Sequence, residues 1–163
     1  MTIWRVLAVA VLLAAVSCAG AARRLVAVES IDSVGRLGWS GIETCATVRN
    51  DLRRDLHLDS CRIVFRVGTG VLAAAELRGG AMIARQSESP VRLRFKIVSD
   101  NPSAMQLLWR KMAAGETGDL LLDIDAAVRI GSRERKICMP QRSLSEILRN
   151  FGVAEDDFAA WFQ

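Results

Sequence analysis

The clearest pattern in the chain is a strict alternation of apolar and polar residues within short segments. In residues 91–98 (VRLRFKIV), apolar side chains occupy every second position, and Arg92, Arg94 and Lys96 occupy the positions between them. Residues 120–130 (LLLDIDAAVRI) alternate in the same way. Because successive side chains of a strand point to opposite faces of a sheet, this pattern predicts strands with one buried and one solvent-exposed face.

Seven segments have the character of strands, and glycine-rich or Asn-containing turn signals separate most of them. They are residues 25–31, 42–49, 60–67, 71–78, 91–98, 120–130 and 134–139. One-sided alternation is typical of antiparallel sheets. A single sheet of this kind would leave its apolar face in water, so two sheets must pack together. The sequence therefore predicts an all-β fold, a two-sheet antiparallel β-sandwich of about seven strands.

Two segments have apolar residues at helical spacing instead. The first is expected near residues 102–114, with a proline at its start and Gly115 as its C-terminal cap. The second is expected near residues 143–152, where Ser143 and Glu146 form the pattern of a capping box. We therefore expect an inserted helix and a C-terminal helix beside the strands.

The N-terminal segment has the composition of an export signal. Arg5 precedes an uncharged, apolar run from Val6 to Gly20, and small residues surround Cys18. The favoured interpretation is a lipoprotein signal that is cut before Cys18, whose thiol then carries the lipid. Two alternatives stay open: an ordinary cut after Ala21, or an uncut anchor, although the run of about 15 residues is shorter than the roughly 20 that a span needs.

This interpretation divides the chain into a signal peptide (1–17), a short tether (18–24) and one domain (25–163). The expected location is the cell envelope, where the protein would be a membrane-anchored lipoprotein facing the periplasm or the cell surface. Secretion as a soluble protein is the alternative.

Lipidation would use one of the four cysteines and leave Cys45, Cys61 and Cys138. Three is an odd number, so at most one internal disulfide can form. Export makes a disulfide chemically reasonable, and Cys45–Cys61 is the pairing that we favour. The alternative is that all three are small buried apolar side chains.

Three longer stretches resemble a known family in their order. The first has a strand ending in Val48-x-Asn50, then a short excursion and a hairpin, in the stretch TCATVRNDLRRDLHLDSCRIVFRVGTGVLAAAEL. The second has a polar turn that leads into the alternating strand, in MIARQSESPVRLRFKI. The third is a closing hairpin, GDLLLDIDAAVRIGSRERKICMP. This order resembles the type 2 late embryogenesis abundant family, also called the water-stress and hypersensitive-response (WHy) domain, which has relatives among small bacterial lipoproteins.

The resemblance runs from about Leu25 to Gly152, although the family usually has Asn-Pro where this chain has Asn50-Asp51. It implies a sandwich of fibronectin- or immunoglobulin-like shape, a binding or protective role, and no active site.

The residues themselves give little sign of catalysis. The single histidine, His57, is expected in a polar loop, solvated, and no cysteine–histidine spacing suggests a metal site. Asp123 and Asp125 share one strand face, and we expect them to form ion pairs with the arginines of residues 91–98. The sequence therefore predicts no enzyme, no cofactor and no metal. A net charge of only +4, in an exported chain, does not indicate nucleic-acid binding.

The candidate binding site is electrostatic. Basic residues on the polar faces of two predicted strands could meet anionic lipid headgroups or an envelope protein. They are Arg92, Arg94 and Lys96, extended by Arg62 and Arg66 if their strand lies alongside. The alternative is an ordinary solvated sheet face, whose basic residues also block edge-to-edge pairing.

The function expected from all this is that of an exported, lipid-anchored, non-catalytic β-sandwich with a binding, scaffolding or envelope-protective role. One alternative is a carrier of a lipid or other apolar ligand, which would need a cavity. Another is a subunit of an envelope complex, held through the C-terminal aromatic residues of FAAWF (158–162) or an exposed sheet edge.

Overall fold

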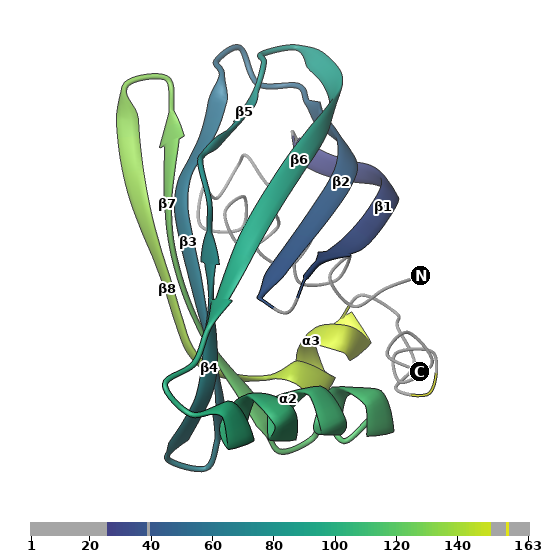
Figure 1. Cartoon of the computed structure of the whole chain (residues 1–163). Helices are drawn as coiled ribbons and strands as arrows, with labels where there is room; N and C mark the ends of the chain where they lie inside the picture. Colours follow the sequence, from purple (N-terminus) through teal and green to yellow (C-terminus); the bar gives the residue numbers. More distant parts are fainter. Residues whose placement is uncertain (1–25, 39, 151–155, 157–163) are drawn as a thin grey trace.

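The computed structural model describes residues 26–38, 40–150 and 156 (Figure 1). Within them, eight strands and two helices follow one another along the chain. They are β1 (Val26–Leu37), β2 (Gly41–Asn50), β3 (Leu56–Val67), β4 (Gly70–Leu77), β5 (Ala81–Ile83), β6 (Ser87–Val98), α2 (Pro102–Ala114), β7 (Leu120–Ile130), β8 (Arg133–Ser143) and α3 (Leu144–Asn150). The signal peptide, Cys18 and the tether predicted from the sequence lie outside the described residues.

The strands form an antiparallel sheet with the order β1-β2-β6-β4-β3-β7-β8, and β5 pairs with the first residues of β3. In Figure 1 the sheet bends into two layers, with β1, β2 and β6 on one side and β3, β7 and β8 on the other. The layers are joined by a short β4–β6 pairing, Ala74–Leu77 with Phe95–Val98. The all-β, antiparallel sandwich-like fold predicted from the sequence is confirmed, and hydrogen bonds link its two layers.

The core lies between the layers and follows the period of two seen in the sequence. From Val91 to Val98 in β6, buried and exposed residues alternate without a break. Leu93 and Phe95 of β6, and Leu122 and Ile124 of β7, are at most 4% exposed. Phe65 of β3 is fully buried among them.

The two helices close one end of the sandwich, below the layers in Figure 1. In α2 the side chain of Asn101 accepts the backbone N–H of Ser103 at 2.9 Å, and Gly115 ends the helix in the left-handed region (φ 71°). Leu108 and Met112 turn inward and are fully buried. Both helices predicted from the sequence are present, and the last residues of the second lie outside the described range.

All seven predicted strands are present, and the structure adds β5. Its three residues are too few for alternation to be visible, but Ile83 is buried and lies opposite Leu56. The structure also starts β3 at Leu56, earlier than the predicted strand at 60–67. The prediction that His57 lies in a loop is therefore wrong: it is a partly buried strand residue opposite Met82 and Arg129.

Candidate functional site

The predicted basic face of β6 is interleaved with carboxylates. Arg92, Arg94 and Lys96 are exposed on the outer surface, but Glu43 of the neighbouring strand β2 lies directly opposite Arg94. Its carboxylate is 2.5 Å from Nε of Arg94 and 3.7 Å from Nε of Arg92. One acidic side chain thus pairs with two of the three basic residues.

Arg62 and Arg66 do not lie alongside β6, because β4 separates β3 from it. Glu76 of β4 lies opposite both Arg62 and Lys96, and its carboxylate is 3.8 Å from Nε of Arg62. Arg66 pairs with Asp123 of β7 instead. The five basic residues named from the sequence therefore share their surface with acidic neighbours, which reduces the positive charge that they present.

Asp123 is held by two strands. Its carboxylate accepts the backbone N–H of Gln141 at 2.8 Å and contacts Nε of Arg66 at 2.5 Å. The hydrogen bond from Gln141, and then the one from Arg66, lower the pKa of Asp123. The predicted ion pairing with residues 91–98 is wrong in its partner, because β7 lies between β3 and β8 rather than beside β6.

Cys45 and Cys61 are free thiols, so the predicted disulfide is not formed. Cys45 lies on β2 opposite Arg92, whereas Cys61 of β3 points into the core, and two strands separate them in the sheet. Burial, and then the charge of Asp125, raise the pKa of Cys61 to about 12. Cys61 is thus the small buried side chain of the alternative interpretation, while Cys138 is exposed.

Two neighbouring grooves of about 460 Å³ each open on the layer formed by β3, β7 and β8. Asp125 and Cys138, opposite each other on β7 and β8, line both. A hydrogen bond to Asp125, and then its negative charge, raise the pKa of Cys138, which keeps this exposed thiol protonated. The grooves thus offer exposed charged groups and a protonated thiol.

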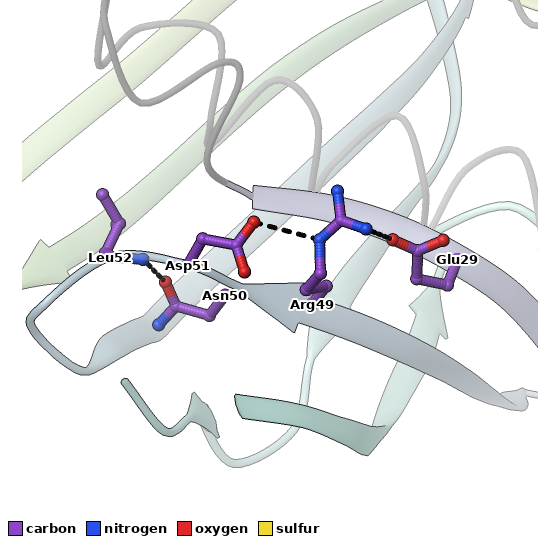
Figure 2. Close-up of polar contacts among 5 residues, drawn as sticks. All are labelled: Glu29, Arg49, Asn50, Asp51 and Leu52. Carbon is purple, nitrogen blue, oxygen red and sulfur yellow. Dashed lines mark hydrogen bonds and ion pairs between the residues drawn. The ribbon is translucent and has the colours of Figure 1, made fainter. Parts of the chain in front are cut away.

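Asn50, at the end of β2, is a fully buried polar residue whose side chain is completely engaged. Its Nδ2 donates to the carbonyl oxygens of Arg54 (3.2 Å) and Ile83 (3.1 Å), and its Oδ1 accepts the N–H of Leu52 (3.0 Å). Figure 2 shows this last bond. Asn50 therefore fixes the loop between β2 and β3 against β5.

Beside Asn50, an arginine joins two strands. Figure 2 shows Arg49 between Asp51, 3.1 Å from its Nε, and Glu29 of β1. Glu29 lies at a bulge in β1, where the register with β2 shifts between Val28 and Ser30. The Arg49–Glu29 pair ties the start of β1 to the end of β2.

Three loops meet at this end of the sandwich: 51–55, 84–86 and 131–132. Asp55 links them, because its side chain accepts the N–H of Arg85 (2.8 Å) and its carbonyl accepts the N–H of Gly131 (3.1 Å). The side chain of Arg54 lies over Gly131, so close that a Cβ there would be 2.8 Å from its Cδ. β1 starts at the same end, since Val26 lies opposite Asn50.

The arginines of these loops are a group that the sequence analysis missed. Four of them are exposed at this end: Arg53, Arg54, Arg85 and Arg133. Within the described part of the chain, none of the four side chains has a carboxylate oxygen within 4.0 Å. The sequence signal was present, since each lies in or beside a turn, but they are up to 80 positions apart (53 to 133). Only the fold brings them to one end.

Two further observations concern the described residues alone. They hold no group of three His, Cys, Asp or Glu side chains placed to bind a metal ion. None of the helices in residues 26–38, 40–150 and 156 is long and apolar enough to cross a membrane.

The chain is similar to some solved structures at low sequence identity. No family model matches the chain, and no curated protein matches it significantly. Among solved structures, a protein from Archaeoglobus fulgidus is similar, with 15% identity, a TM-score of 0.42, and coverage of 71% of this chain and 98% of that one. The GAE domain of yeast GGA1 is similar with 10% identity, a TM-score of 0.31, and coverage of 70% and 94%.

Proposed function

We propose that the chain is an exported lipoprotein whose β-sandwich is tethered to a membrane through Cys18 and acts by binding, as a scaffold or protective module of the cell envelope. The observation that carries the proposal is a spacing. The uncharged run of the sequence ends beside Cys18, and β1 begins only eight residues later, at Val26. The first described strand would thus begin only a short tether away from the lipid attachment site.

The contacts of the titratable groups support a binding role over catalysis. Asp123 is bonded to Gln141 and Arg66, and Glu43 is shared by Arg92 and Arg94. These carboxylates are engaged by structural partners, whereas a hydrolase needs a free acid or base. The raised pKa of Cys61, about 12, disfavours its thiolate form.

Core packing supports binding at the surface over transport of an apolar ligand. Leu93 and Phe95 fill the sandwich from one layer, and Leu122 and Ile124 fill it from the other. A lipid carrier would need these side chains to move apart. For the alternative of an envelope-complex subunit, the strands β1 and β8 lie at the two edges of the sheet order, while residues 158–162 lie outside the described range.

The resemblance to the type 2 late embryogenesis abundant family remains part of this proposal. The Asn50 that the resemblance singles out is the buried residue that organises the loop after β2. Its contacts give a physical reason for an asparagine at that position.

The test is the intact mass of the mature protein from membrane and soluble fractions, for the unaltered chain and for Cys18→Ala. We expect a diacylated mass beginning at Cys18 in the membrane fraction, and loss of the Cys18→Ala variant from that fraction. An unmodified N-terminus near Ala22 in the soluble fraction would overturn the anchor and leave the alternative of a secreted protein.

A further inference from the structure

We propose that the loop end of the sandwich, defined by Arg53, Arg54, Arg85 and Arg133, docks on the anionic phospholipid headgroups of the membrane that anchors the chain. This inference deepens the proposed function and rests on its lipid anchor. It replaces the outer face of β6 as the surface that meets the membrane.

The described chain begins at the loop end of the sandwich. Val26 lies opposite Asn50, at the same end as the three loops tied together by Asp55. Val26 lies eight positions after Cys18, and a chain of that length spans at most about 29 Å when fully extended. Arg23 and Arg24 lie within this stretch. The lipid anchor thus keeps the loop end within reach of the headgroups.

The loop end presents positive charge through its four arginines. The four loop arginines are exposed and, in the described residues, have no carboxylate within ion-pair distance. The acidic groups at this end lie beside two other arginines. Asp51 and Glu29 pair with Arg49, Asp59 pairs with Arg129, and Glu88 and Glu134 lie opposite these same two arginines. Asp55 accepts two loop N–H groups through its side chain and carbonyl.

Hydrogen bonds hold the backbone of this surface in place before any membrane is bound. The side chain of Asn50 donates to the carbonyl oxygen of Arg54. Asp55 accepts the N–H groups of Arg85 and Gly131, and the carbonyl oxygen of Leu52 accepts the N–H of Gln86 at 3.1 Å. The arginines are therefore presented together by a fixed backbone, so little ordering is needed on binding. The arginines of the outer sheet face, by contrast, have Glu43 and Glu76 beside them.

The test measures which end of the lipidated protein lies at the membrane. Cysteine is placed for a fluorescent donor at Met82 or at Val71, in a chain with Cys45→Ser and Cys138→Ser. These two positions are equally exposed (57% and 53%), and they lie opposite His57 and Arg66 of β3. Those partners lie nine positions apart along the strand, which is about 30 Å. We measure the efficiency of energy transfer from this donor to an acceptor on the lipid headgroups, in vesicles of phosphatidylcholine with phosphatidylglycerol.

We expect greater transfer from position 82 than from position 71. The difference should shrink to the value that the tether alone produces in vesicles of phosphatidylcholine alone, in high salt, and in the variant Arg53→Gln/Arg54→Gln/Arg85→Gln/Arg133→Gln. Each arginine removed should shift the ratio of docked to undocked orientations about five-fold. The matched variant Arg62→Gln/Arg92→Gln/Arg94→Gln/Lys96→Gln should keep the difference, because its residues lie on the outer sheet face.

Equal transfer from the two positions on anionic vesicles would overturn the proposal, as would loss of the difference only in the matched variant. The mass of the same preparation separates this failure from failure of the proposed function. A lipidated mass together with equal transfer would contradict only the docking surface. A mass without lipid would contradict the lipid anchor and, with it, the docking surface.

Discussion

The carboxylate of Asp123 in β7 accepts the backbone N–H of Gln141 in β8, at a bulge between the two strands. Leu122 pairs with Arg142 and Ile124 with Met139, so that two residues of β8 face Asp123 alone. Gln141 adopts a left-handed conformation (φ 51°), and its N–H is turned to the carboxylate. Asp123 therefore stabilises an irregularity that the ladder itself leaves unpaired.

Replacing Asp123 by Asn should lower stability in a pH-dependent way. The pKa of Asp123 in the folded state lies below its ordinary value of 3.8, so the ionised form stabilises the fold above that pH. This contribution is lost as the pH falls through the lowered pKa. We expect Asp123→Asn to cost about 1 kcal/mol at pH 7, and the difference to shrink toward pH 2 in urea unfolding.

The matched control for this measurement is Asp59→Asn, which removes an exposed carboxylate from its pair with Arg129. Exposed pairs contribute little, so its effect should be smaller at every pH. A loss of stability in Asp123→Asn that stays constant from neutral to acid pH would show that the charge of Asp123 is not the cause.

Asn50 should tolerate no substitution that changes its hydrogen bonds. Asn50→Asp keeps the acceptor for Leu52 but turns a carboxylate toward the carbonyl oxygens of Arg54 and Ile83. We expect a loss of about 3 kcal/mol or more at neutral pH, because a buried group without its partner is destabilising. The loss should diminish in acid, where protonation restores a donor.

Asn101→Asp is the control for that variant, because it makes the same chemical change at an exposed helix cap. There the side chain only accepts the N–H of Ser103, which aspartate does equally well. Thermal unfolding of the two variants should therefore differ strongly. Equal effects would mean that the contacts of Asn50 are not what holds the loop.

The three described cysteines should differ in reactivity. In a Cys18→Ala background, Cys61 should resist maleimide at neutral pH until the protein unfolds, because burial raises its pKa to about 12. Cys138 is exposed but held protonated by Asp125, so Asp125→Asn should speed its labelling severalfold. Asp59→Asn should leave that rate unchanged. Native labelling of Cys61 would contradict the packing described for β3.

The strands could be predicted from the sequence because one buried face requires an apolar residue at every second position. Val91 to Val98 alternates in the structure as it does in the sequence. The pattern states which face of a strand is buried, but not which strand lies beside it. The sequence therefore predicts the arginines of β6 as partners of Asp123, whereas in the structure β3 and β8 lie beside β7. Register and strand order depend on long-range pairing, which alternation does not encode.

The candidate site was predictable only in part for the same reason. Arg92 and Arg94 lie two positions apart in the sequence, whereas Glu43, which pairs with both, comes from β2. Glu76, which lies opposite Lys96, comes from β4. The arginines of the loop end became neighbours only when the turns after β2, β5 and β7 met at Asp55. Turn residues have no periodicity from which the proximity of these three turns could be predicted.

The packing of α2 against the sandwich gives a last prediction, on how the helix-covered end is closed. Leu108, on the inward face of α2, is fully buried, while its neighbour Leu107 is only partly buried. Leu108→Ala should destabilise the fold by about 2 to 5 kcal/mol, because it leaves a cavity in a packed core. Leu107→Ala, the same change one position away, should have clearly less effect in urea unfolding. If both variants lost the same small amount, α2 would be a loosely attached cover, and the sandwich would be open to an apolar ligand from this end.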